Sequence, residues 1–331
     1  MRHRVLSFVL VAVTLLALTG SVFAQGTRVD QIVGFAQTPG VPAVASGTFQ
    51  PTVMATDLPT QQMAAVLSPY VTDMDAWFAM NFGWRSSKPV TFVLFSNGQN
   101  EINALQSMVG PGQVVNTNLV LSRPSFPLLI GNSAFGIPIG EWAILVNTSL
   151  DTATQQAGQL NSLFYTENGV FPIPMSSILE SQDEGMRLMQ ESMAADYAGL
   201  MEVDTAGNAG PTWYRLGLAN TIAFQIVPGT PMQGGQPMTV ATYQHVNNTL
   251  PPLTDLEQNW NGIIGLGGQI VDVAHGIAYL STSFVVGQAG GMNALDVLKS
   301  TASGQDFNTA LQSITGFSLP MLNLQYQSLI P

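Results

Sequence analysis

Apolar residues recur along this chain first with the period of a strand and later with the period of a helix. Residues 49–55 predict a strand that Pro51 restricts to the edge of a sheet. Residues 90–95, Val-Thr-Phe-Val-Leu-Phe, are hydrophobic and rich in β-branched and aromatic side chains, which predicts a central strand. Further strands are expected at residues 119–122 and 142–147.

The helical pattern is strongest in the second half of the chain. Before it, apolar side chains at three- and four-residue steps predict a helix over 59–82 that ends at Gly83, and a shorter helix is expected at 100–108. From residue 178 the apolar residues step by 3, 4, 4 and 3, at Met186, Met189, Met193, Tyr197 and Leu200. A loop is expected at 204–210 and a connector rich in glycine and proline at 228–237. The remaining helices are expected at 211–227, 253–260, 269–286, 292–300, 306–314 and 319–329.

This order of elements predicts an α+β fold, with an N-terminal mixed sheet and its helices followed by an all-helical half. We place a signal peptide at 1–24 and an irregular arm at 25–48. An α/β sheet subdomain follows at 49–177, and a helical subdomain at 178–331.

The first 24 residues have the pattern of a secretory signal peptide. A basic start, Met1-Arg2-His3-Arg4, precedes an apolar run that is short for a membrane span, and Val22 and Ala24 supply small side chains for cleavage after Ala24. We therefore expect an exported protein, secreted or held at the cell envelope, with no stable membrane span after cleavage. An uncleaved N-terminal anchor is the alternative interpretation.

Charge and composition exclude several classes of binding partner and of catalytic site. Cleavage leaves 9 − 2 = 7 basic residues against 20 acidic ones, a formal charge of −13, which argues against nucleic acid and anionic membranes. The chain has no cysteine, so disulfides, thiol catalysis and cysteine-bound metals are excluded. Only His245 and His275 remain after cleavage, and each is read as an ordinary, partly buried histidine.

Two segments carry a resemblance to a known family. Pro211-Thr212-Trp213-Tyr214-Arg215-Leu216-Gly217-Leu218-Ala219 resembles the second helix of gluzincin-like zinc metallopeptidases (the peptidase-MA-like group), which opens with Pro-x-Trp-x-x-Glu-Gly-x-Ala. The preceding stretch Gln190-Glu191-Ser192-Met193-Ala194 aligns with the His-Glu-x-x-His of their catalytic helix. The order and spacing of strands 90–95 and 142–147 and of the helical tail agree with that family, so the resemblance implies a thermolysin-like scaffold.

The chain departs from the family at the metal site. The resemblance places Gln190 and Ala194 at the two histidine positions and Leu216 at the third ligand position, and alanine and leucine have no donor atom. Glu191 alone is kept, as a vestigial general base with no metal-bound water to deprotonate. No metal and no cofactor are therefore expected, and apolar contacts are expected to close the former zinc pocket.

The resemblance also implies a substrate cleft beside the metal site, and this cleft is expected to be retained. The resemblance implies that Trp142, Asn147, Trp213 and Tyr279 line it, and that strand 142–147 borders it and pairs with an extended peptide. A calcium site is a weaker alternative to a solvated acidic helix face, built from the carboxylates of Asp183, Glu184, Glu191, Asp196, Glu202 and Asp204.

Three functions remain open at this point. The first is a secreted pseudopeptidase that binds a peptide or another extracellular protein without cleaving it. The second is an active hydrolase with a non-standard site around Glu191, which requires Glu191, Glu202 and Asp204 to converge in one concave site. The third is a structural or envelope-associated protein, favoured if Ala194 and Leu216 lie in a filled core without a cleft.

Overall fold

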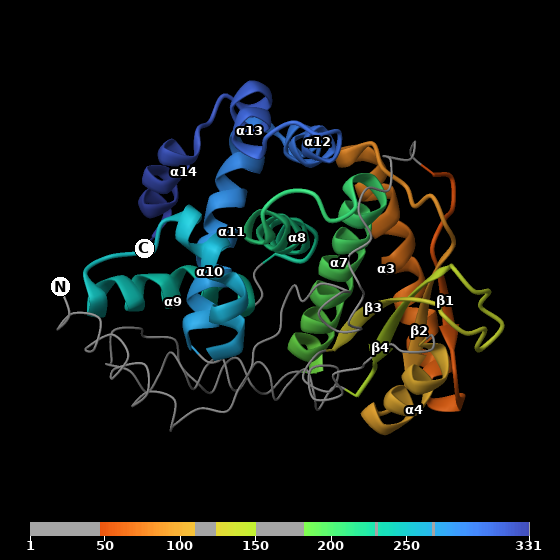
Figure 1. The fold of residues 1–331 in the computed structure, drawn as a ribbon. Coiled ribbons are helices and arrows are strands. Elements are labelled where there is room, and N and C mark those ends of the chain that lie inside the picture. Colours follow the sequence, from red (N-terminus) through yellow and green to blue (C-terminus); the bar gives the residue numbers. More distant parts are fainter. Residues whose placement is uncertain (1–46, 110–123, 150–181, 229–230, 267–268, 331) are drawn as a thin grey trace.

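The computed structural model describes residues 47–109, 124–149, 182–228, 231–266 and 269–330. A small sheet with its helices forms one side of the molecule, and a group of helices forms the other (Figure 1). This arrangement confirms the α+β class and the order of a mixed sheet first and helices afterwards. The expected signal peptide, the arm and the strand at 119–122 lie outside the described residues.

The sheet has four strands in the order β1-β2-β4-β3. β1 (Thr52–Ala55), β2 (Val90–Phe95) and β4 (Trp142–Asn147) run parallel, and β3 (Ser125–Leu129) pairs antiparallel with β4. The edge position of β1 and the central position of β2 agree with the prediction. The expected pairing of strand 142–147 with a peptide is wrong, because β4 already has a neighbour on each side.

β3 was missed in the sequence because two prolines, Pro124 and Pro127, stand in and beside it. Hydrogen bonds from Asn147 N–H to Pro124 O (2.9 Å) and from Ile130 N–H to Glu141 O (2.9 Å) show which residues of β3 bond to β4. Every second residue does so, beginning with Pro124 and ending with Ile130. In that alternation the main-chain groups of residues 125, 127 and 129 point away from β4. Pro127 therefore costs the ladder no hydrogen bond, which is how an edge strand tolerates proline.

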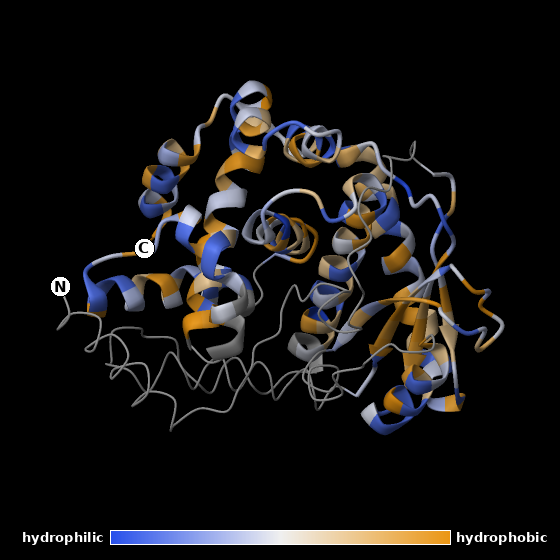
Figure 2. Cartoon of the chain, in the orientation of Figure 1, coloured by the Kyte–Doolittle hydropathy of each residue, from blue (hydrophilic) through white to orange (hydrophobic). Residues whose placement is uncertain are grey.

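Each face of the sheet is covered by helices. Every second side chain of the strands points to one face of the sheet and packs against α3 (Leu58–Phe82) and α7 (Gln182–Ala206). Phe92, Ile144 and Val146 belong to this face. The side chains on the other face pack against α4 (Gly98–Met108) in a second, smaller core that includes Phe126 and Leu145. Figure 2 shows the strands in largely hydrophobic colours, as expected for a sheet buried on two faces.

The N-terminus of α3 is fixed to the sheet by its cap. The Asp57 carboxylate accepts a hydrogen bond from Thr60 N–H, and the Thr60 hydroxyl in turn accepts from Asp57 N–H, which makes a capping box. Asp57 also accepts from the Ser96 hydroxyl at 2.5 Å, directly after β2. At the other end Gly83 adopts φ 61°, the left-handed cap predicted for that glycine.

The helical half is built around α8 (Thr212–Ile226), which Figure 1 shows end-on between α7 and α11 (Gln269–Ala289). The other described helices of this half lie around α8 and α11. They are α9 (Pro231–Asn247), α10 (Leu253–Leu266), α12 (Gly291–Ala302), α13 (Phe307–Thr315), α14 (Leu319–Gln325) and a final 3₁₀ turn (Tyr326–Leu329). Gly290, Gly304 and Gly316 have positive φ at the breaks between helices.

Two boundaries differ from the prediction. Residues 231–237 belong to α9 and not to a connector, although Pro237 lies inside the helix. Packing against α11 stabilises this helix despite its poor propensity, since Val240 is buried against Gly276. α7 runs through 204–206 because the Asp204 side chain is held by neighbouring hydrogen bonds, and the loop starts only at Gly207 (φ 58°).

α11 is the most apolar helix of this half. By length and composition alone its stretch Ile270–Ala289 is apolar enough to cross a membrane. In the structure about two thirds of this stretch is buried, as in the core helix of a globular protein. α8 approaches it so closely that a Cβ added to Gly217 would lie 2.2 Å from the Ala278 carbonyl oxygen.

Replacing Gly217 by alanine is expected to lower the free energy of unfolding by about 1–3 kcal/mol, because the new methyl group overlaps main-chain atoms that cannot rotate away. Gly199, inside α7, is the matched control, since a Cβ there meets nothing within 4 Å. Gly199→Ala is expected to raise stability by about 0.5–1 kcal/mol through helix propensity. Urea unfolding followed by circular dichroism measures both, and equal effects would contradict the close contact.

Candidate functional site

The positions that the resemblance assigns to metal ligands lie on α7 and α8. Ala194 is fully buried and Leu216 is 3% exposed, and both belong to the main hydrophobic core. Gln190, one turn before Ala194 on α7, is half-buried. Apolar packing therefore occupies two of the three positions that the resemblance assigns to metal ligands.

Glu191 is buried next to two tyrosines from other helices. It is 1% exposed, and its charge acts on Tyr70 of α3 and on Tyr279 of α11. The Tyr70 hydroxyl donates to the Gln190 carbonyl oxygen at 2.6 Å, which ties α3 to this turn of α7. The Tyr279 hydroxyl is hydrogen-bonded to the Gln233 side chain of α9. Four helices thus contribute polar groups around one carboxylate.

The two tyrosines keep their protons at neutral pH. Burial is the main cause that raises the pKa of Tyr70, and the Glu191 charge adds to it. Burial likewise raises the pKa of Tyr279, against the hydrogen bond from Gln233, which lowers it. Both phenols therefore serve as neutral hydrogen-bonding groups and not as bases.

The edge strand β3 is attached to α7 directly beside Glu191. The Ser125 hydroxyl lies 2.6 Å from a carboxylate oxygen of Asp196 and 2.8 Å from the Ser192 hydroxyl. All three side chains are buried, and Ser192 and Asp196 are one helical turn apart. This polar contact fixes the register of the edge strand against the helix that carries Glu191.

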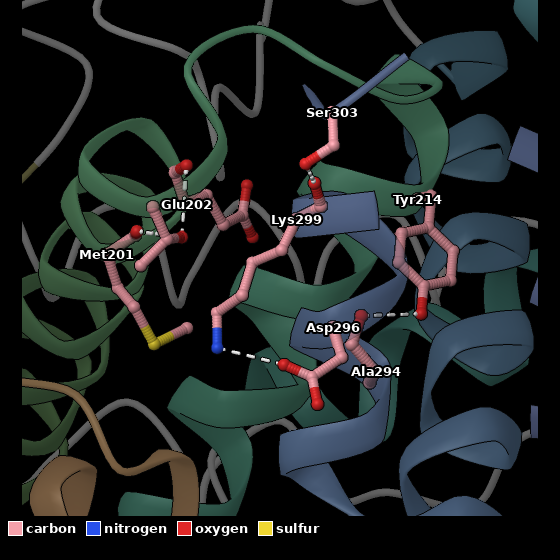
Figure 3. Close-up of polar contacts among 8 residues, drawn as sticks. Met201, Glu202, Tyr214, Ala294, Asp296, Lys299 and Ser303 are labelled. Atoms are coloured by element: carbon pink, nitrogen blue, oxygen red, sulfur yellow. Dashed lines mark hydrogen bonds and ion pairs between the residues drawn. The ribbon is translucent and has the colours of Figure 1, made fainter. Parts of the chain in front are cut away.

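A second buried polar group lies near the C-terminal end of α7. Glu202 forms an ion pair with Arg215 of α8 at 3.6 Å, and both side chains are 3% exposed. Arg215 also donates to Asn208 at 3.2 Å, across the turn between the two helices. Burial, with the Glu202 charge as a second cause, raises the pKa of Tyr214, whose hydroxyl donates to the Ala294 carbonyl of α12 at 3.0 Å (Figure 3).

Two aspartates hold the segment before β2 against α7. Asp204 accepts hydrogen bonds from the Trp84 indole N–H (3.2 Å) and from the N–H and hydroxyl of Ser87. Asp75 of α3 accepts from the Tyr197 hydroxyl at 2.8 Å and lies 3.6 Å from the Arg85 guanidinium. These side chains connect elements of the sheet half, so we assign them a structural role.

Of the carboxylates considered for a calcium site or an alternative hydrolase site, the four whose side chains are described do not converge. Glu191 faces the tyrosines, Asp196 faces β3, Glu202 pairs with Arg215 and Asp204 binds the segment before β2. Among the described residues no three His, Asp or Glu side chains are grouped closely enough to hold a metal ion. The side chains of Asp183 and Glu184 lie outside those described.

The residues expected to line a cleft separate in the structure. Tyr279 contacts the surroundings of Glu191, and its ring meets the edge of Phe224 at 4.8 Å. Trp213 is buried against Tyr214 and Phe307, whereas Trp142 and Asn147 are buried at opposite ends of β4. His275 is stacked on Trp260 (5.7 Å, 17°), and His245 is exposed at the end of α9.

Sequence reasoning missed two polar residues of this region. Asn220 lies one turn after Leu216 on α8 and is 2% exposed, and its amide nitrogen has no hydrogen-bond partner in the described part of the chain. Asp272 lies in the first turn of α11, two turns before Tyr279, and burial raises its pKa to about 8. Neither residue belongs to a recognisable motif, and only their polar character inside apolar helices marks them in the sequence.

Asp272 predicts a dependence of stability on pH. Its pKa rises from 3.8 to about 8 on folding, so between these values the folded protein keeps a proton that the unfolded chain has lost. The free energy of unfolding is therefore expected to fall as pH rises from about 4 to 8. Asp272→Asn should flatten this part of the profile and be more stable than the wild type at pH 8 by at least about 1 kcal/mol.

Urea unfolding at several pH values measures this profile. Asp73→Asn, at an exposed position of α3, is the control for the loss of one negative charge. Parallel profiles for the wild type and Asp272→Asn would contradict the burial of a protonated carboxyl group.

Comparison with known proteins adds no assignment to this geometry. The chain matches no protein-family model, no curated protein and no solved structure.

Proposed function

We propose that this protein is an exported pseudopeptidase, a non-catalytic relative of the gluzincin-like metallopeptidases that binds an extended segment of a peptide or another extracellular protein. The observation that carries the proposal is the edge strand β3, fixed beside the helix that holds Glu191. Peptide binding by strand addition needs main-chain groups at a sheet edge and no catalytic residue.

The main-chain geometry of β3 suits this role. The N–H groups of Ser125 and Leu129 and three carbonyl oxygens point away from β4, and no described strand pairs with that side. Ser125 is fully buried and Leu129 is partly exposed, so the end of the strand at Leu129 is the part that a peptide would reach first. The Ser125 contact with Ser192 and Asp196 holds this strand against α7, the helix that also carries Gln190 and Glu191. Side chains of such a peptide would meet this polar region and gain specificity from it.

The apolar ligand positions support a role without zinc hydrolysis. Ala194 and Leu216 have no donor atom and lie in the core, so Glu191 has no metal-bound water from which to take a proton. The hydrolase alternative required Glu191, Glu202 and Asp204 to converge, and they bind different elements. A purely structural role is the second candidate, favoured by the filled core at Ala194 and Leu216.

Leu129→Pro tests strand addition. It removes an N–H that points away from β4, so the sheet is expected to remain intact while the affinity for peptides falls about tenfold, the value of one hydrogen bond. Peptides are first selected from a displayed library of random dodecamers with the wild-type protein. Isothermal titration calorimetry then gives the dissociation constant of each synthetic peptide for both proteins.

The opposite edge of the sheet supplies the matched control. Thr56 N–H donates to Leu94 O, so the N–H of Ala55 on β1 points away from β2. Ala55→Pro therefore removes an equivalent edge group and is expected to leave peptide affinity unchanged. Failure to select any peptide, or equal loss in both variants, would reject strand addition at β3 and favour the structural role.

Elemental analysis of the purified protein tests the loss of the metal site. After incubation with zinc and desalting we expect far less than one zinc ion per chain, and no cleavage of casein or of the selected peptides. Stoichiometric zinc removable by a chelator, with chelator-sensitive cleavage, would show that Gln190, Ala194 and Leu216 are not the former ligand positions.

A further inference from the structure

The side chain of Asn220 on α8 is buried without a hydrogen-bond partner among the residues that the structure describes. Asn220 is 2% exposed, and its amide nitrogen finds no acceptor there. Thr221, the next residue, shows the usual situation, because its hydroxyl lies 3.0 Å from that of Thr282 on α11. A buried donor without an acceptor is costly and rare, so the exception requires an explanation.

The position of Asn220 relates this donor to the polar group around Glu191. On the helix Asn220 neighbours Leu216 on one side and Phe224 on the other, each four residues away. Phe224 meets the ring of Tyr279 edge-on at 4.8 Å, and Tyr279 is hydrogen-bonded to Gln233 and affected by the Glu191 charge. The donor thus lies on the stripe of α8 that faces the junction of α7 and α11.

This junction combines complementary hydrogen-bonding groups. Glu191 brings a carboxylate, and the Tyr279 hydroxyl and the Gln233 amide can each donate and accept. Asn220 adds an N–H donor that none of the described residues accepts. The aromatic rings of Phe224 and Tyr279 and the apolar side chain of Leu216 supply the surrounding surface. A peptide bond matches this set, because it carries one acceptor and one donor between apolar carbon atoms.

We propose that Asn220 is the donor of a binding site for a peptide-bond carbonyl at the junction of α7, α8 and α11. The inference deepens the proposed function, since it rests on a peptide as the ligand and names a contact beyond the β3 edge. Bound peptide would supply the missing acceptor. The free protein then carries an unsatisfied donor that is compensated only in the complex, which exchanges stability for affinity.

If Asn220 lowers stability and raises affinity, its replacement should change the Tm and the peptide affinity in opposite directions. Asn220→Leu replaces the unsatisfied amide by an apolar group of similar shape, so the Tm of the free protein is expected to rise by about 2–4 °C. The affinity for the selected peptides is expected to fall about tenfold. Thr221→Val is the matched control on the same helix: it removes a partnered hydroxyl, and is expected to lower Tm and leave affinity unchanged.

A direct test uses the wild-type protein and a defined probe. The side-chain amide signals of Asn220 in ¹⁵N NMR spectra, identified by their absence in Asn220→Leu, are followed during titration with N-methylacetamide. We expect a saturable shift with this probe and none with tert-butanol, which has similar size and lacks an amide. A lower Tm for Asn220→Leu, no shift, or equal shifts with both probes would overturn the inference.

These readouts separate the inference from the proposed function. Melting and N-methylacetamide binding do not require any selected peptide or the β3 edge. A saturable shift at Asn220 combined with unchanged peptide affinity in Leu129→Pro would support the amide site and reject strand addition. The reverse result would reject the amide site while the β3 edge stands.

Discussion

The helical half depends on one main-chain contact, the approach of α8 to α11 at Gly217. Because this residue has no side chain, the helices are near enough for Thr221 and Thr282 to meet and for Phe224 to reach Tyr279. α9 is positioned in a similar way, since Gly276 of α11 leaves room for the Gln236 main chain and Val240. Gly217 and Gly276 therefore set the distances between α8, α9 and α11, the helices that carry Phe224, Gln233 and Tyr279.

α7 and α8 are linked by apolar packing and by one buried ion pair. Leu216 and Ala194 fill the space between α7 and α8 with carbon atoms, and the buried Glu202–Arg215 pair connects the same helices farther along. A buried pair of this kind contributes little net stability, but the loss of either partner leaves an uncompensated charge. Packing therefore holds the helices together, and the ion pair selects how they are aligned.

The sequence predicted most of the elements because their apolar residues are periodic and their ends carry glycine. It failed where tertiary contacts override local preference. β3 contains proline yet pairs through its other edge, α9 contains proline yet packs on α11, and the last turn of α7 is extended by the bonds of Asp204. The filled positions at Ala194 and Leu216 were predictable from side-chain chemistry. Asn220 was not, because a missing partner is a property of the folded environment.

The position of α7 between the two halves affects how the protein unfolds. This helix is bound on one side to the sheet half, through Ser125, Tyr197 and Asp204, and on the other side to α8 through Glu202. Separation of the two halves would strip one side of α7 and expose its core residues to water. Because the boundary between sheet and helices joins them in this way, we expect the two regions to melt together in one cooperative step.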